Sequence, residues 1–395
     1  MSAGLPPLSE TALLGVLGGT ALAALFALGT VLFRKGRTED QARAYLAGVH
    51  YVLSDNPDGA IAELSKAARL NTQTYETYFA LAALLRRKGE LAWAIRINQN
   101  DLLCNNLTEQ VRRRAQLELA LDYRRSGLKD EAVAAFETLL KDEPRHREAL
   151  LRYRQMVEET RDLSRAIELQ ERLVELDGRG ENVLAHLLAE HAQEQLALDP
   201  DGALILSHRA TVTDARCAHA WRTLAQAQIG RGDKGLAQAA LRQALALEPE
   251  LVPGALALMR EVFEPLSDGE RFLDGERAQR KAPHAAPYEL ALALWHRADG
   301  KMQLATVELK RLVERSPSYL EARKELGALL LSQDGSDELR ADYREMLGTL
   351  GRPALAFVCR QCHQRLAQYG FRCTYCGEWD SVQRDHPSAE SQPRI

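Results

Sequence analysis

Residues 218–249 read AHAWRTLAQAQIGRGDKGLAQAALRQALALEP, and this stretch carries the pattern on which the fold depends. Apolar residues recur at helical spacing on both sides of Gly232, and Pro249 follows the second run. A glycine between two amphipathic runs and a proline after them predict two helices joined by a short turn. The small residues Ala225 and Ala237 would let these helices cross closely. One pair cannot bury its apolar face alone, so the pattern predicts stacked neighbours.

The same pattern recurs with a period of about 34 residues. Successive units begin near residues 41, 75, 113, 147, 184, 218, 252, 286 and 320. The pattern resembles the tetratricopeptide repeat, and the resemblance covers roughly residues 40–350. It implies an all-α superhelix of about nine degenerate units over residues 41–350. Such arrays usually bind a peptide or a protein, although the fold alone does not decide the function.

Two units depart from the pattern. In the unit near residue 252, Arg271 stands where a small residue is expected. The unit near residue 184 carries Glu190, His191 and Glu194 at positions that are normally small or apolar. These departures fit a drift of the repeat, a kink or a contact site, and the repeat count depends on which of these applies.

Two Cys-x-x-Cys pairs stand near the C-terminus, Cys359 with Cys362 and Cys373 with Cys376. Each pair fits a tight turn that directs two sulfurs at one point. Two facing turns would give the tetrahedral set of four thiolates that zinc or a single iron accepts. Two short-range disulfides are the alternative, but paired Cys-x-x-Cys spacing in a helical protein favours a metal in a reducing compartment. The spacing therefore predicts one Fe or Zn ion without separating the two.

Three other side chains bear on this prediction. Gly377 follows the second pair, as the turn needs, and His363 takes that place after the first pair. His363 is an alternative ligand, but four cysteines already complete the site. Cys104 and Cys217 stand alone in the sequence, and we expect both to be small buried side chains.

The metal-binding module is predicted to span residues 357–380 and to be rubredoxin-like or zinc-ribbon-like. It is rich in aromatic residues: Phe357, Tyr369, Phe371, Tyr375 and Trp379. A module this small has almost no core, so metal–thiolate bonds would supply much of its folding free energy. Because the module cannot hide so many aromatic rings, we expect it to dock on the last repeats. The polar stretch 383–395 is predicted to be a disordered tail.

The N-terminus predicts one transmembrane helix. Residues 11–33 carry no charge, and at helical rise they span about 34 Å, enough for a hydrocarbon core of about 30 Å. Residues 1–10 hold no Lys or Arg, whereas residues 34–40 are basic. The positive-inside rule then predicts a short periplasmic N-terminus at 1–10, a basic juxtamembrane linker at 34–40 and the bulk of the chain on the cytoplasmic side.

A stripe of small residues runs along this predicted helix. Its members recur every four residues: Gly15, Gly19, Ala23 and Ala27. Such a stripe lets another helix approach closely, and a second copy of the chain is one candidate, which would make a homo-oligomer. The alternative is that small residues are simply common in membrane helices.

The composition and the absence of catalytic motifs limit the classes of function that fit this sequence. Among 395 residues, 46% are hydrophobic, only 6% are aromatic and the net charge is −4. Ala, Leu, Glu, Arg and Gln dominate, as in helical proteins. The sequence has no His-Glu-x-x-His, no Gly-x-Ser-x-Gly and no phosphate-binding glycine loop. We therefore expect a protein that is not an enzyme.

The order of these parts resembles the lipopolysaccharide assembly protein B family. Local stretches add to the likeness, at residues 45–54 (YLAGVHYVLS) and 87–97 (RKGELAWAIRI). The resemblance implies a single-pass protein of a bacterial inner membrane that regulates lipopolysaccharide biosynthesis. As an adaptor, it would present the lipid A pathway deacetylase to the FtsH membrane protease, beside other lipopolysaccharide-assembly membrane proteins. It also implies that Cys359, Cys362, Cys373 and Cys376 bind the metal and that this metal is iron.

Three alternatives use the same features differently. A four-thiolate iron site could serve a membrane-tethered electron carrier, although no flavin or nicotinamide motif accompanies it. The array could be a general protein-assembly scaffold. A zinc ribbon could bind nucleic acid through the arginines of the C-terminal segment, Arg360, Arg365, Arg372 and Arg384. Because the chain is acidic overall, we expect no nucleic-acid partner.

Overall fold

The computed structural model describes residues 40–51, 54, 56–70, 75–102, 108–281, 284–316, 319–332 and 357–385. The predicted segments 1–10 and 11–33, almost all of the linker 34–40, Cys104 and residues 386–395 lie outside these ranges. Among the described residues, no helix is both long and apolar enough to cross a membrane. The chain forms two compact units, Met1–Met156 and Val157–Ile395.

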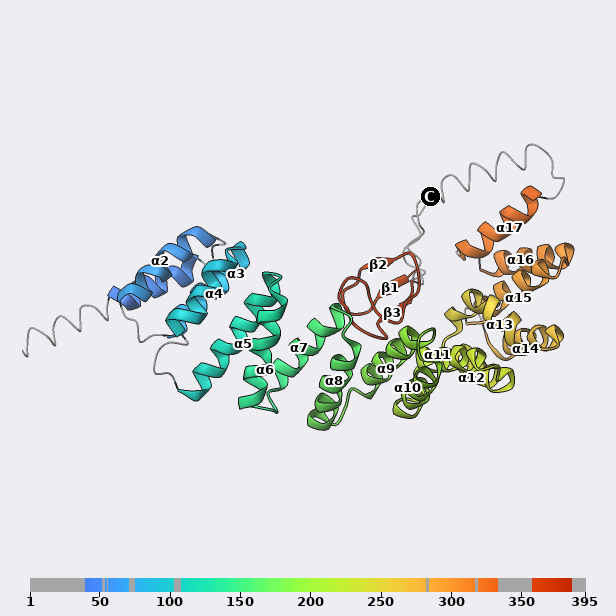
Figure 1. The fold of residues 1–395 in the computed structure, drawn as a ribbon. Helices are drawn as coiled ribbons and strands as arrows, with labels where there is room; N and C mark the ends of the chain where they lie inside the picture. Colours follow the sequence, from blue (N-terminus) through green and yellow to red (C-terminus); the bar gives the residue numbers. More distant parts are fainter. Residues whose placement is uncertain are drawn as a thin grey trace, which may run out of the picture. The chain divides into compact units, whose positions relative to one another are not determined.

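The N-terminal unit is made of helices (Figure 1). Residues 40–51 are helical. They are followed by α2 (Pro57–Leu70), α3 (Tyr75–Lys88), α4 (Leu91–Arg96), the π-helix η1 (Ile97–Leu102), α5 (Glu109–Arg125), α6 (Lys129–Asp142) and α7 (Arg147–Glu159), whose end belongs to the second unit.

The second unit continues the helix pairs and adds a small sheet. Its helices are α8 (Leu163–Asp177), α9 (Glu181–Gln195), α10 (Pro200–Thr213), α11 (Ala218–Gly230), α12 (Lys234–Leu247), η2 (Pro249–Leu251), η3 (Pro253–Ala255), α13 (Leu256–Val262), α14 (Leu266–Gln279), α15 (Ala286–Ala298), α16 (Met302–Arg315) and α17 (Leu320–Ser332). The strands are β1 (Phe357–Cys359), β2 (Arg365–Leu366) and β3 (Val382–Arg384). The fold is an all-α tetratricopeptide-repeat array with a small C-terminal four-cysteine module, which confirms the predicted fold class for the described residues.

The pair α11–α12 shows how the repeat sequence makes the fold. Gly232 has a φ of 84°, a left-handed conformation that glycine adopts without strain, and it lies in the turn between the helices. Ala225 on α11 and Ala237 on α12 are both fully buried, as expected where two helices cross closely. A larger side chain at either alanine would force the helices apart.

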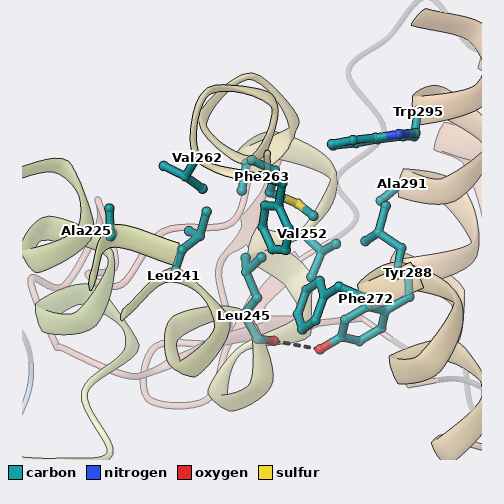
Figure 2. Close-up of a cluster of buried hydrophobic side chains, with 14 of the residues drawn as sticks. Ala225, Leu241, Leu245, Val252, Val262, Phe263, Phe272, Tyr288, Ala291 and Trp295 are labelled. Atoms are coloured by element: carbon teal, nitrogen blue, oxygen red, sulfur yellow. Dashed lines mark hydrogen bonds between the residues drawn. The ribbon is translucent and has the colours of Figure 1, made fainter. Parts of the chain in front are cut away.

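The main core of the second unit lies between α11 and α15 (Figure 2). Leu241 and Leu245 of α12 pack there with Phe263 and Phe272, and all four are buried. The buried Tyr288 of α15 donates a hydrogen bond from its hydroxyl to the carbonyl oxygen of Leu245 (2.6 Å). The core therefore consists mainly of apolar side chains; the Tyr288 hydroxyl is hydrogen-bonded, whereas the buried Trp295 Nε1 has no hydrogen-bond partner among the described residues.

The unit near residue 252 keeps its close helix contact but shifts it along the chain. Arg271, at the position where the repeat has a small residue, pairs with Asp268 and is exposed. The close contact occurs instead at Gly269, where an added Cβ atom would lie 2.5 Å from the Trp295 ring. This unit is therefore displaced in register, and its first helix α13 is short.

The polar residues of the unit near residue 184 bind the preceding turn. Arg161 has a φ of 65°, and its guanidinium pairs with Glu190 (2.6 Å) and Glu194 (2.5 Å) of α9. His191 lies 3.4 Å from the Ser164 hydroxyl. These side chains replace the usual apolar contact between neighbouring repeats with polar contacts.

The C-terminal module is a three-stranded antiparallel sheet in the order β2-β1-β3. Phe357 faces Leu366 on one side and Arg384 on the other. Strand β3 extends past the predicted module end at 380 and into the range 383–395 that we predicted as disordered. The correction has a physical reason: Arg384 is held by ion pairs, which a composition argument does not foresee.

Candidate metal centre

The structure brings Cys359, Cys362, Cys373 and Cys376 together. Their sulfur atoms all lie within 4.8 Å of one another, although they come from two turns. The Sγ atoms of Cys359 and Cys376 are 3.6 Å apart, and those of Cys362 and Cys373 are 3.7 Å apart. All four are free cysteines, and only Cys376 is exposed. The alternative of two short-range disulfides is therefore not what the structure contains.

The two turns have the same construction. In the first, the Gln361 amide donates to Cys359 Sγ (3.4 Å) and the His363 amide donates to Cys359 O (3.0 Å). In the second, the Tyr375 amide donates to Cys373 Sγ (3.4 Å) and the Gly377 amide donates to Cys373 O (2.9 Å). Amides directed at sulfur stabilise thiolate charge, so each turn is built to hold anionic sulfur.

His363 occupies the turn position that glycine occupies in the other half of the site. Its φ is 56° and that of Gly377 is 72°, so both residues adopt the left-handed conformation that lets the chain turn back. The His363 side chain is exposed. The residue has a backbone role in the turn, which accounts for its place after the first cysteine pair.

The donor set and its spacing fit one metal ion. Four sulfurs around a metal with bonds of about 2.3 Å would be about 3.8 Å apart, close to the separations of 3.6 Å and 3.7 Å between the two sulfur pairs above. Burial opposes ionisation of the Cys359 thiol, but hydrogen bonding to Ser381 and the backbone outweighs it and lowers its pKa to about 6. Burial and the neighbouring thiols raise the pKa of Cys376 to about 12, so Cys359 ionises more readily than Cys376, and thiolate is the form that binds metals.

The module docks on the repeats through stacked rings. Trp379 stacks on His186 of α9, with ring centroids 4.4 Å apart and planes 13° apart. Phe371 stacks on His219 of α11, with centroids 4.6 Å apart and planes 13° apart. The guanidinium of Arg222 lies 5.2 Å from the centre of the Phe371 ring. Docking is confirmed, and it joins the second cysteine turn to two neighbouring repeats.

Polar contacts surround these rings. The Asp380 carboxylate lies 2.7 Å from His186 Nε2 and accepts a hydrogen bond from Asn182 (3.3 Å). The Trp379 indole donates to Glu158 Oε1 (3.2 Å), and Arg372 pairs with the same carboxylate (3.1 Å). Glu158 and His186 are almost fully buried, so both depend on these partners for the loss of water.

A second set of contacts lies near the end of α12 and the start of α17. Tyr369 donates a hydrogen bond to Glu248 (2.9 Å). Arg384 pairs with Glu250 (2.6 Å) and Glu321 (3.3 Å), and its guanidinium lies 4.6 Å from the centre of the Tyr319 ring. The expected docking on the last repeats is therefore correct only in part, because α9 and α11 of the middle repeats provide the stacked contacts.

Three comparisons with known proteins bear on this architecture. Residues 117–181 match the family model described as the tetratricopeptide repeat. The chain is 26% identical over 345 residues to lipopolysaccharide assembly protein B of Escherichia coli K12, covering 86% of this chain and 89% of that protein. It is 25% identical over 380 residues to the protein of the same name from Haemophilus influenzae, covering 90% and 94%.

Over most of its length, the chain is similar to lipopolysaccharide assembly protein B. A crystal structure of a tetratricopeptide repeat protein from Parabacteroides merdae covers 74% of this chain and 99% of that one, with 14% identity and a TM-score of 0.35. The likeness to lipopolysaccharide assembly protein B confirms the resemblance found in the sequence, and it extends well beyond the 65 residues of the repeat match.

Sequence reasoning did not single out the two buried histidines that contact the module, His186 and His219. These two side chains are 1% and 3% exposed, and His296 is buried as well. The separation of 33 residues between His186 and His219 is close to one repeat, and this was the available signal, since it places both rings on the same face of successive first helices. Cys217, which lies 3.7 Å from His186 Nδ1, is buried as predicted.

The pKa values of the His186 and His219 rings are shifted in opposite directions. Burial opposes the charge on His186, but hydrogen bonding to Asp380 and Cys217 outweighs it and raises its pKa to about 9. Burial, together with the charges of His186 and Arg222, lowers the pKa of His219 well below its ordinary value. Near neutral pH, therefore, His186 is the charged partner of Asp380, and neutral His219 can accept a hydrogen bond from His186 across 3.2 Å.

Proposed function

We propose that this chain is an inner-membrane adaptor that regulates lipopolysaccharide biosynthesis. Its repeat array would bind the lipid A pathway deacetylase and present it to an FtsH-type membrane protease, beside other lipopolysaccharide-assembly membrane proteins. The predicted helix at 11–33 would tether it. The observation that carries this proposal is the similarity to lipopolysaccharide assembly protein B over 86% of this chain and 89% of that protein.

The surroundings of Cys217 support a role without catalysis. Together with His186 and Asp380, this thiol most resembles the nucleophile site of an enzyme. His186 lies between Cys217 and Asp380 in space. Its Nδ1 atom is 3.7 Å from Cys217 Sγ, and its Nε2 atom is 2.7 Å from Asp380 Oδ1. However, Cys217 is 4% exposed and the stacked Trp379 covers His186. A thiol that no substrate can reach supports a structural contact and does not support an acyl-transfer site.

We propose further that Cys359, Cys362, Cys373 and Cys376 bind one iron or zinc ion and that this ion has a structural role. The resemblance to rubredoxin-like modules favours iron. When bound, the ion would supply four bonds that close both cysteine turns. The backbone amides of the turns would stabilise the thiolates, and Phe371 and Trp379 would join the closed second turn to the repeats.

The adaptor role is tested by the lifetime of the lipid A deacetylase in cells depleted of this protein. We expect a longer lifetime after depletion. The full chain should restore it, and a version without residues 1–37 should not. Cys373→Ser should also fail to restore the normal deacetylase lifetime. Tyr375→Ser changes an exposed residue between Cys373 and Cys376 and should restore it. An unchanged deacetylase lifetime after depletion would contradict the proposal.

The identity of the bound metal distinguishes the adaptor hypothesis from the electron-carrier hypothesis. Zinc in place of iron keeps a four-thiolate site closed but cannot change oxidation state. We expect zinc-loaded protein to restore the deacetylase lifetime as well as iron-loaded protein does. A requirement for iron would favour the electron carrier.

A further inference from the structure

Most ring contacts between the module and the repeats come from one hairpin. The Asp380 amide donates a hydrogen bond to the Phe371 carbonyl (2.7 Å), which closes this hairpin two residues before Cys373 and four residues after Cys376. Trp379 lies on the returning side. A change in the cysteine turn must therefore move the two rings that contact the repeats.

The surface beneath the hairpin is polar. It consists of side chains from the first helices of four repeats (α7, α9, α11 and α17) and from η2: Glu158, Asn182, His186, His219, Glu321 and Glu250. We call this set the inner-face site. Polar interfaces with aromatic rings are typical of contacts that form and separate, whereas obligate interfaces are largely apolar. Because water can solvate these six side chains, the inner-face site can exist uncovered without exposing a large apolar patch.

A short segment of the module, which turns at Asp380 and ends in β3, supplies three complementary groups. It is Gly377-Glu-Trp-Asp-Ser-Val-Gln-Arg384, and it contains no cysteine. Its indole stacks on His186 and donates to Glu158. The carboxylate of Asp380 faces charged His186, and the guanidinium of Arg384 faces Glu250 and Glu321. Asp380 and Arg384 of the segment thus each meet the opposite charge on the repeats.

We propose that the inner-face site is a binding site for a protein segment of the form Trp-Asp-x-x-x-Arg. The module's own segment fills it as long as both cysteine turns are closed. A partner that carries an indole followed by a carboxylate, with a guanidinium four residues later, occupies the site when the module leaves. The cysteine turns therefore control access to this face of the array.

The test uses a fluorescently labelled peptide of residues 377–384 and the full-length chain in detergent. The receiving protein is a chain whose own segment is disabled, Trp379→Ala with Asp380→Ala. We expect saturable binding to this vacated chain and at least tenfold weaker binding to the unmodified chain. Adding His186→Ala to the vacated chain should abolish binding, and a peptide with Asp380→Asn should bind at least tenfold more weakly than the unaltered peptide.

Two controls keep the outcome interpretable. Tyr375→Ala alters the exposed tip of the cysteine turn and should leave the site filled, so it should behave as the unmodified chain does. The single variant Asp380→Ala removes the carboxylate contacts with His186 and Asn182 but keeps the indole, and it replaces the double variant if the latter loses helicity by circular dichroism. Equal binding to the unmodified and vacated chains, no binding to a helical vacated chain, or binding that is insensitive to His186→Ala would each overturn the proposal.

Discussion

Leu241 and Trp379 are both buried, but different surroundings bury them. Leu241 is fully buried among apolar side chains of its own and neighbouring repeats (Figure 2). Trp379 is covered by the His186 ring and donates to the carboxylate of Glu158, a residue 221 positions away in the chain. The repeat core is therefore stabilised by apolar burial between neighbours, whereas the module interface depends on ring stacking and charge. This difference predicts that the two regions fail independently.

The largest expected effect is the loss of the module's fold in Cys373→Ser. A module this small depends on its metal, and structural sites of this kind contribute about 10–16 kcal/mol of binding free energy. We expect limited proteolysis to cleave the segment 357–385 while circular dichroism shows an intact helical array. Tyr375→Ser is the matched control and should keep its protection. Unchanged protection in Cys373→Ser would show that the module folds without a complete cysteine set.

Leu241→Ala tests the other side of the comparison. Removing this fully buried side chain from α12 should lower the free energy of unfolding of the array by about 2–5 kcal/mol. Leu236→Ala on the same helix removes a side chain that is 60% exposed, and its effect should stay within about 0.5 kcal/mol. Urea unfolding followed by circular dichroism measures both. Equal effects would contradict the core described here.

A pair of glycines in α14 sharpens the account of the shifted repeat. Gly269→Ala would place a Cβ atom against the Trp295 ring and should destabilise the array by about 1–3 kcal/mol. Gly275→Ala on the same helix meets no atom within 4 Å and should stabilise it by about 0.5–1 kcal/mol. The two shifts in unfolding midpoint should have opposite signs. A stabilising Gly269→Ala would show that the close contact lies elsewhere.

The smallest expected effect is a pH window for docking. The raised pKa of His186 means that its pairing with Asp380 is fully present below its ordinary value of 6.5 and is lost as the pH rises through about 9. The lowered pKa of His219 acts at the other end, because undocked His219 gains a proton below about pH 6.5 and docked His219 does not.

Docking should therefore be strongest between about pH 6.5 and pH 9. The groups that face His186 are Asp380, Cys217 and His219, and Arg222 lies beside His219. Protease protection of residues 357–385, measured from pH 5 to pH 10 at constant ionic strength, reports the window. In His186→Phe, which keeps the ring, the loss of protection toward high pH should disappear. If it persists there, another group controls it.

The repeat and the cysteine site could be predicted from sequence because both are local patterns. Ala225 and Ala237 recur at fixed positions, and each Cys-x-x-Cys pair makes its own turn regardless of the rest of the chain. Two local predictions were still incomplete. Arg271 marked a unit whose close contact had moved to Gly269, and composition assigned Arg384 to a tail although it belongs to β3.

The module interface could not be predicted because its partners are distant and polar. A histidine on a helix face gives no sign of its partner, and the stack of His186 on Trp379 joins residues that only the fold brings together. Likewise, Glu158 looks like a surface residue in sequence until Trp379 and Arg372 are placed beside it. Docking could be expected from the excess of aromatic rings, but the repeat that receives them could not.

The central claim is that a metal closes the module and that the closed module covers α9 and α11. Hydrogen–deuterium exchange on the full-length chain, with and without a metal chelator, tests it most directly. We predict that chelation raises exchange in residues 357–385 and in α9 and α11 around His186 and His219, and leaves α5 and α6 of the other unit unchanged. Unaltered exchange in α9 and α11, with the metal shown to be removed, would contradict the account.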